Sequence, residues 1–339
     1  MIEDDIRNFN QQFAWEPVVE NAVGLEKKPM TILLGMGGSH LGGDLLNAYD
    51  PNLGLMVHSN YDLPANVSRE DLIIASSYSG NTEEVIDGLE QAVSKGFKVA
   101  VMASGGRLIE IAKEKGLPYI KLPSGLQPRM SLGFQIKALT KLLGYQKAFE
   151  EAGELAGELN SAELEERGKM LAEKIKDKIP VIYSSEANRA LAYIWKVKFN
   201  ESSKVPAFYN VFPEVNHNEI NGFTQNLVMD KSEIYPLENS RAKSRGSRVG
   251  GISDLSFAFF LLSDSEDRPR IQKRMKVWAK LFQDRNFPVE VIDLTGQGRF
   301  YRLFSNLLLA DWASYYLAKQ NGTDPEAIPL VEEFKKLIK

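Results

Sequence analysis

Cysteine is absent from the 339 residues of this sequence. Its absence excludes disulfide bonds, catalysis by a thiolate, and metal sites that use thiolate ligands. Histidine is also scarce, because the chain contains only His40, His58 and His217. A metal site built from several histidines is therefore not expected, and we predict no metal.

Long apolar runs are missing as well, since none reaches the roughly 18 residues that a membrane-spanning helix needs. The acidic and polar start of the chain, MIEDDIRNFN, is unlike a signal peptide. A formal net charge of −4 is unfavourable for general binding to nucleic acid or to an anionic membrane. We therefore expect a cytoplasmic protein that binds neither nucleic acid nor membrane.

Short apolar segments alternate with amphipathic segments along the whole chain. Such alternation is typical of an α/β fold, in which a mainly parallel sheet is flanked by helices on both faces. The alternation occurs twice, and a charge-rich helical stretch at 134–178 separates the two sets. We therefore predict two domains, each an α-β-α sandwich, at residues 1–150 and 151–339.

The segment SSYSGNT ends a predicted strand and begins a predicted helix. Ser77, Ser79 and Thr82 provide three hydroxyl groups, and Gly80 relieves the turn between them. Together with the N–H groups and the positive dipole end of a helix N-terminus, these hydroxyls favour a phosphate site without lysine or arginine. The alternative is a simple helix cap, although a cap needs only one hydroxyl.

A second glycine-rich segment, GMGGSHLGGD, follows the first predicted strand. The dinucleotide-binding pattern requires a glycine where His40 stands, and a P-loop requires Gly-Lys-Ser/Thr, so neither nucleotide site is expected. Both loops fall at strand ends, where open α/β sheets bind ligands. The matching strand ends of the second half carry the carboxylates of Glu186, Asp264, Glu266 and Asp267. We expect these to repel phosphate, so that only the first half binds an anion.

Three further residues are candidates for catalysis. Glu201 ends a predicted helix that also carries apolar residues, and a carboxylate set against apolar surface accepts a proton more readily, as a general base must. His217 lies in a polar loop, and histidine exchanges protons near neutral pH. Arg129 follows a proline in a loop and can stabilise a developing oxyanion. A solvated glutamate, a packing histidine and a surface ion pair remain the alternatives.

These segments resemble one protein family. GMGGS, SSYSGNT, PR-x-SLG, FNE-x-x-K and PE-x-x-HNEI, in this order, resemble the bifunctional phosphoglucose/phosphomannose isomerases, which consist of two sugar-isomerase (SIS) domains. The C-terminal GTDPEAIPLVEEFKKLIK also looks like the ending of that family. The resemblance implies an aldose–ketose isomerase that interconverts glucose 6-phosphate and fructose 6-phosphate through a cis-enediol intermediate. Mannose 6-phosphate stays open as a second substrate.

The resemblance also implies how the substrate is held. The N–H of one glycine and four hydroxyl groups would bind the phosphate of a sugar phosphate. The matching residues in this chain are Gly38, Ser39, Ser77, Ser79 and Thr82. No cofactor is implied, because enediol chemistry needs one mobile base and an electrostatic clamp for the enediolate.

The resemblance assigns the chemical steps to four side chains. Glu201 would move a proton between C2 and C1, and Arg129 would stabilise the negative charge of the intermediate. His217 would protonate the ring oxygen and open the pyranose. Lys335 would assist at the ring oxygen or the hydroxyls, with the adjacent Lys336 as the alternative. In the family the histidine comes from the partner subunit, so the resemblance implies a homodimer with His217 contributed across the interface.

Two other functions stay open. A non-catalytic SIS module that senses sugar phosphates would keep SSYSGNT but need neither Glu201 nor His217. An amino-sugar phosphate isomerase would share the phosphate loop but should lack PE-x-x-HNE. His40 stands where the family usually has a smaller residue, and the polar stretch 224–254 is longer than the usual family connection. This stretch is either a solvated loop or a lid, so the substrate range stays open.

Overall fold

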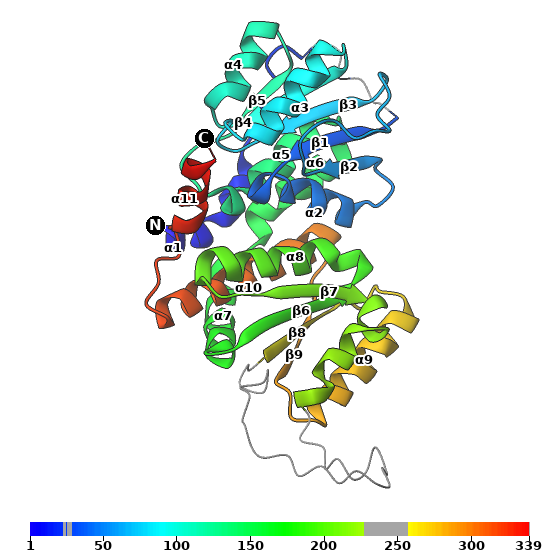
Figure 1. Ribbon diagram of the computed structural model, residues 1–339, viewed down its shortest axis with the longest axis vertical. Helices are drawn as coiled ribbons and strands as arrows, with labels where there is room; N and C mark the ends of the chain where they lie inside the picture. Colours follow the sequence, from blue (N-terminus) through cyan, green and yellow to red (C-terminus); the bar gives the residue numbers. More distant parts are fainter. Residues whose placement is uncertain (23–24, 26–28, 227–256, 339) are drawn as a thin grey trace, which may run out of the picture.

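The computed structural model describes residues 1–22, 25, 29–226 and 257–338, and it contains two parallel sheets (Figure 1). The first sheet has the strand order β2-β1-β3-β4-β5, and the second has the order β7-β6-β8-β9. The strands are β1 (Thr31–Gly35), β2 (Leu55–His58), β3 (Leu72–Ser76), β4 (Lys98–Ala103), β5 (Tyr119–Lys121), β6 (Ile179–Ser185), β7 (Phe208–Phe212), β8 (Phe257–Ser263) and β9 (Val289–Asp293). Residues 227–254 of the polar stretch noted in the sequence lie outside the described residues.

Helices follow or precede most of these strands. They are α1 (Ile2–Arg7), α2 (Leu41–Tyr49), α3 (Glu83–Ser94), α4 (Gly106–Lys115), α5 (Leu132–Leu142), α6 (Gln146–Glu158), α7 (Ser161–Ile175), α8 (Arg189–Lys198), α9 (Pro269–Gln283), α10 (Arg299–Gln320) and α11 (Pro329–Leu337). No described helix combines the length and the apolar character needed to cross a membrane.

The central strands are covered on both faces. Every residue of β1 (TILLG) and of β3 (LIIAS) is buried, and so are the five central residues of β8. A strand that helices cover on both sides has no solvent-facing side, which is why these strands are continuous apolar runs in the sequence. This arrangement confirms the predicted α/β class.

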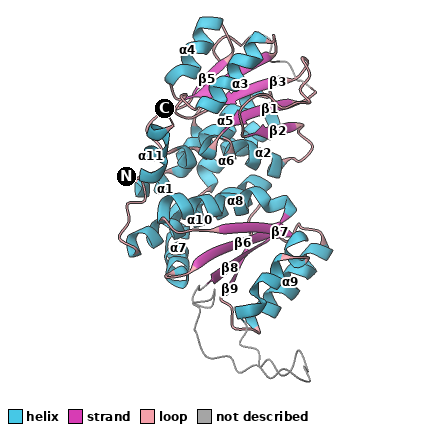
Figure 2. Ribbon diagram, viewed as in Figure 1, coloured by secondary structure: helices cyan, strands magenta, loops and turns pink. Residues whose placement is uncertain are grey.

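Alternate residues of each strand face different cores. In the first sheet Ile32 packs in an outer core with α3 and α4, whereas Leu33 packs in an inner core. In the second sheet Tyr183 packs in an outer core with α9, whereas Ile182 joins the same inner core. Helices α2, α8 and α10 lie between the two sheets (Figure 2), and their apolar side chains make the inner core continuous from one sheet to the other.

Two helices of the second half, α8 and α10, differ in how they end. Helix α10 ends at Gln320, and Gly322 shortly after it has a φ of 64°. The helix predicted over 186–202 is interrupted, because α8 is followed by a π-helical turn, η5 (Phe199–Ser203). This wider turn carries Glu201 out of the regular helical register.

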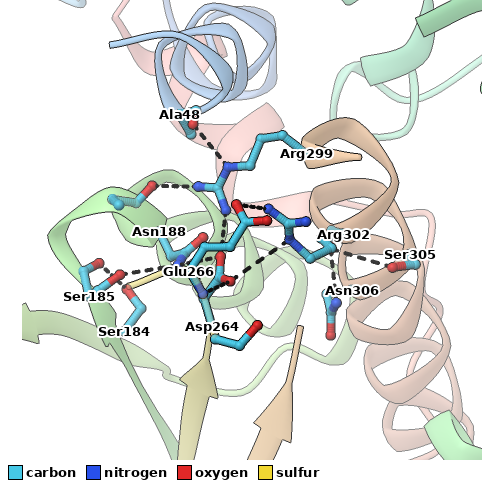
Figure 3. A network of polar contacts seen from close by, with 12 residues as sticks. Ala48, Ser184, Ser185, Asn188, Asp264, Glu266, Arg299, Arg302, Ser305 and Asn306 are labelled. Atoms are coloured by element: carbon cyan, nitrogen blue, oxygen red, sulfur yellow. Dashed lines mark hydrogen bonds and ion pairs between the residues drawn. The ribbon is translucent and has the colours of Figure 1, made fainter. Parts of the chain in front are cut away.

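A polar network around Arg299 joins the two halves of the chain (Figure 3). Its Nη1 lies 2.7 Å from Oδ2 of Asp264, at the end of β8. Its Nη2 donates to the carbonyl of Ala187 at 2.9 Å, and its Nε donates to the carbonyl of Ala48 in α2 at 3.1 Å. One guanidinium therefore connects α2 of the first half to two strand ends of the second.

The same network includes two of the four carboxylates noted in the sequence. We expected the carboxylates at the strand ends of the second half to repel an anion. Asp264 is paired with Arg299, and Glu266 is paired with Arg302 (Figure 3). Asp264 and Glu266 thus each have a cation beside them, whereas Oδ2 of Asp267 is buried and has no hydrogen-bond partner among the described residues.

Candidate active site

The two loops predicted to bind phosphate lie side by side. β1 and β3 are paired in parallel, with Gly35 opposite Ser76, so the loops that follow them begin at the same sheet edge. The Oγ of Ser39 accepts a hydrogen bond from the N–H of Tyr78 at 2.9 Å. The Oγ of Ser76 donates to the carbonyl of Ser39 at 2.7 Å. The two loops are therefore held to each other at the edge where open sheets of this kind bind ligands.

The three hydroxyl groups of the second loop form a cluster. The Oγ of Ser77 lies 2.8 Å from Oγ1 of Thr82 and 3.4 Å from Oγ of Ser79. Thr82 is the N-cap residue of α3 but makes no side-chain hydrogen bond to the first turn of that helix. The simple helix-cap interpretation therefore fails, and the hydroxyls lie together at a helix N-terminus that favours an anion.

Gly80 fixes the shape of this loop. Its φ is 73°, a left-handed conformation that glycine adopts most readily. A Cβ at this position would lie 1.8 Å from the carbonyl oxygen of Gly105 in the neighbouring loop. The loop therefore has this form only with glycine at position 80.

The first loop packs on the turn that carries Arg129. Gly38 lies in the 3-10 turn η2 (Gly37–Ser39), and a Cβ on it would lie 2.6 Å from the backbone nitrogen of Arg129. Arg129 lies in the 3-10 turn η3 (Pro128–Met130). The side chain of Gln135 donates both to the carbonyl of Gly38 at 2.9 Å and to that of Pro128 at 3.2 Å. The first loop and the turn that carries Arg129 are thus in direct backbone contact.

Arg129 is fully buried and reaches the second half of the chain. Its Nη1 lies 3.0 Å from Oε2 of Glu201, whose side chain is 31% exposed. Its Nε donates to Oγ of Ser202 at 3.3 Å, and its Nη2 donates to the carbonyl of Pro325 at 2.7 Å. Three partners in different directions fix the plane of the guanidinium, as bidentate and forked donors allow.

The setting of Glu201 differs from the one expected. The sequence predicted a carboxylate set against apolar surface, whereas its Oε2 is paired with the buried guanidinium of Arg129. The apolar residues of the preceding helix, among them Ile194 and Trp195, are buried in the inner core instead. The pairing joins the two residues that the sequence treated as separate candidates.

Lys204 was not singled out from the sequence, although it is the lysine of FNE-x-x-K. Its Nζ donates to the carbonyls of Glu201 at 2.6 Å, Ser202 at 3.2 Å and Asp324 at 2.6 Å. Burial lowers its pKa, and the charge of Arg129 lowers it further. The ammonium therefore binds two carbonyls of the π-helical turn and one carbonyl of the segment that precedes α11.

His217 lies at the other end of β7 from Glu201. The side chain of Asn200, next to Glu201, accepts a hydrogen bond from the N–H of Ala207 at the start of β7. His217 follows the turn at the end of β7 and is exposed. A strand of this length spans about 16 Å. The two side chains of one chain therefore do not meet around one small ligand.

The carboxylates that flank His217 have other partners. Glu219 accepts a hydrogen bond from the hydroxyl of Tyr183 at 2.6 Å and another from the side chain of Asn210. Glu214 accepts one from the side chain of Asn218 at 2.6 Å. Both carboxylates therefore have partners other than the imidazole of His217.

Lys335 and Lys336 both lie on α11, and both are exposed. Within the described parts of the chain, no hydrogen bond or ion pair joins either lysine to Glu201 or Arg129. The segment before α11 is nevertheless held at the site, because the carbonyl of Pro325 accepts from Arg129 and that of Asp324 accepts from Lys204. Of the predicted site residues, one chain brings together Gly38, Ser39, Ser77, Ser79, Thr82, Arg129 and Glu201, but neither His217 nor Lys335.

His40, which follows Ser39, points away from this cluster. Its Nδ1 lies 2.7 Å from Oδ2 of Asp44, and its ring stacks on Tyr193 with centroids 5.8 Å apart. It lines a cleft of about 1120 Å³ between α2 and the strand ends of the second sheet. The larger residue at this position is thus accommodated by packing between the two halves.

Comparisons with known proteins agree with this geometry. Residues 164–338 match the family model of the bacterial phospho-glucose isomerase C-terminal SIS domain. The chain is 33% identical over 341 residues to a bifunctional phosphoglucose/phosphomannose isomerase of Aquifex aeolicus. The aligned region covers 98% of this chain and 97% of that protein. It is also 33% identical to the protein of the same name from Caldicellulosiruptor bescii, over 91% of this chain and 88% of that protein.

Solved structures show the same fold at much lower identity. The C-terminal domain of the glucosamine-fructose-6-phosphate aminotransferase of Francisella tularensis superposes with a TM-score of 0.66 and 14% identity, covering 96% of both chains. Tagatose-6-phosphate ketose/aldose isomerase of Escherichia coli also superposes with a TM-score of 0.66 and 14% identity, over 96% of this chain and 94% of that one. These two likenesses establish the SIS fold.

Proposed function

The chain belongs to the bifunctional phosphoglucose/phosphomannose isomerase family, and we propose from this premise how its residues carry out the reaction. It is an aldose–ketose isomerase that acts on glucose 6-phosphate and mannose 6-phosphate and yields fructose 6-phosphate. One observation carries the residue assignment: the buried Arg129 pairs with Glu201 at 3.0 Å and also packs against the phosphate loop at Gly38. An acid–base group and a fixed cation thus lie beside an anion site.

The phosphate of the substrate binds at the paired loops. The N–H of Gly38 and the hydroxyls of Ser39, Ser77, Ser79 and Thr82 donate to its oxygens. The N-terminus of α3 adds the positive end of its dipole, and no lysine or arginine is needed there. The hydroxyls already contact one another in the structure, so binding requires them to rotate toward the ligand and no backbone movement.

Glu201 moves the proton once the sugar is open. Its carboxylate takes the proton from C2, the C2–H electron pair forms the C1–C2 double bond, and the carbonyl oxygen at C1 becomes an enediolate oxygen. The proton of the O2 hydroxyl passes to O1, and the same carboxyl returns its own proton to C1 as the O2 oxygen becomes the new carbonyl, so no proton is gained or lost overall. Arg129 stabilises the negative charge of the enediolate, because its guanidinium is fixed before the charge develops.

His217 opens the pyranose ring from a second copy of the chain. Its position at the far end of β7 supports this assignment, because the imidazole of one chain does not meet Glu201 of the same chain. Helix α11 supports a dimer as well, since Leu330, Phe334 and Leu337 are 78%, 61% and 78% exposed and would benefit from cover by a partner. Lys335 lies on this helix and would contact the sugar hydroxyls in the assembled dimer.

A coupled assay tests the assignment. Wild-type protein should convert glucose 6-phosphate and mannose 6-phosphate to fructose 6-phosphate, and Glu201→Gln should lose both turnover and the exchange of the C2 proton with solvent deuterium. Glu158→Gln, at the exposed end of α6, is the matched control and should keep full activity. Binding without any turnover would indicate a sensor, and turnover only on glucosamine 6-phosphate would indicate an amino-sugar enzyme. Full turnover in Glu201→Gln would end its assignment as the base.

A further inference from the structure

A fully buried ion pair lies next to the proposed site. The Nζ of Lys198, at the end of α8, lies 2.6 Å from Oδ1 of Asp311 in the middle of α10, and the two side chains are 0% and 1% exposed. Burial lowers the pKa of Lys198 and raises that of Asp311, since both lose their contact with water. Such pairs contribute little to stability, because apolar residues of similar size often serve as well or better. Packing alone therefore does not explain why two charges occupy this core.

The pair is not fully satisfied within the described structure. Oδ2 of Asp311 has no hydrogen-bond partner there, although it is buried. An unpartnered carboxylate oxygen is destabilising in an apolar core. A feature that opposes stability and is still present calls for a role other than stability.

The contacts of Lys198 lead to the site. Its Nζ donates to the carbonyl oxygen of Arg129 at 2.7 Å and lies 3.4 Å from Sδ of Met130. Lys198 thus binds the backbone of the turn η3, and the side chain of Arg129 in that turn pairs with Glu201. The ammonium is suited to this because it has three donors, whereas methionine has none and a glutamine amide has only two.

The geometry couples three elements. Lys198 stands three residues before Glu201 in one continuous helical run, so the same run carries the base and the anchor of its partner. Arg129 comes from the first half of the chain, whereas Lys198 and Asp311 come from the second. A shift of η3 relative to α8 would therefore move the guanidinium away from the carboxylate, and Asp311 fixes the ammonium that prevents this shift.

We propose that Lys198 and Asp311 are a positioning pair that sets the distance between the guanidinium of Arg129 and the carboxylate of Glu201. This inference rests on the proposed function of those two residues. The pair touches no substrate and none of the phosphate-binding hydroxyls. Its loss should therefore slow the chemical step and leave binding of the phosphate nearly unchanged.

The deciding variant replaces both charges by apolar residues of similar size, Lys198→Met with Asp311→Leu. Single variants leave one buried charge without its partner and are expected to fold poorly, whereas the double variant leaves none. We expect it to fold, with a kcat lower by about tenfold or more because a displacement of the reacting groups by about 1 Å has effects of that order. KM for the sugar phosphate should change less than twofold.

The control is Phe282→Leu, in the outer core of the second sheet. It lowers stability without touching the site, and it should keep the kcat of the wild type. If the double variant folds and keeps its kcat, or if KM rises as much as kcat falls, the positioning role is wrong. A wild-type protein without isomerase activity would instead overturn the proposed function, so the two failures are distinguishable in one assay.

Discussion

Mixing two inactive variants tests whether His217 acts across a dimer interface. Glu201 and His217 flank β7 at opposite ends, separated by about 16 Å of strand. In a symmetric dimer of Glu201→Gln with His217→Asn, one site contains both lesions and the other contains neither. Each mixed dimer therefore has one intact site out of two.

The magnitude follows from random assortment. A one-to-one mixture that exchanges subunits yields mixed dimers as half of the population, so about a quarter of the wild-type activity should return. The assay is formation of fructose 6-phosphate after co-refolding or co-expression of the two variants. Each variant refolded alone gives the background.

A second mixture is the matched control. Arg129 contacts Glu201 within one chain, so Glu201→Gln mixed with Arg129→Ala leaves one lesion in every site of the mixed dimer. This mixture should stay inactive. Activity in the control, or none in the mixture with His217→Asn, would refute the arrangement that we infer.

Four further outcomes follow from individual contacts. Arg129→Ala should lower kcat by about 10²–10³-fold, as loss of a fixed oxyanion donor does, in steady-state assays. Gly80→Ala should raise KM for the sugar phosphate and lower Tm, because its Cβ would overlap a backbone oxygen at 1.8 Å. Arg299→Met removes the closer of the two cations beside the buried Asp264 and should reduce the free energy of unfolding by about 3–5 kcal/mol in urea titrations. Burial raises the pKa of Asp267, so its stabilising protonated state is lost as pH rises. Asp267→Asn should therefore stabilise the fold at neutral pH, and the gain should disappear in acid; an unchanged difference between pH 4 and 7 would contradict this.

Local patterns in the sequence were sufficient for the elements and for the cluster of hydroxyl groups. The continuous apolar runs of β1 and β3 predicted strands buried on both faces, and the structure confirms them. The three hydroxyls of SSYSGNT fall within six residues, so one turn of backbone brings them together. The division into domains at 1–150 and 151–339 stays a prediction.

The contacts around Glu201 could not be predicted from the sequence. Arg129 and Glu201 are 72 residues apart, and Lys198 is 69 residues from the carbonyl that it holds. The sequence suggested an apolar setting for Glu201, because a guanidinium that comes from the other half of the chain has no effect on local residue spacing. The lysine of FNE-x-x-K was visible in the motif, but its three carbonyl acceptors, one of them Asp324, were not.

The sequence by itself determined which segments become strands and helices and which hydroxyl groups gather in one loop, since these depend on residues that are neighbours along the chain. Only the tertiary structure decided which charges meet: Arg129 with Glu201, Lys198 with Asp311, and Arg299 with Asp264. Each of these pairs joins elements that are distant in sequence, and the packing of α2, α8 and α10 between the sheets brings them together. The energy of an ion pair depends on distance in space and on burial, and neither is fixed until the elements that carry the two charges pack against each other.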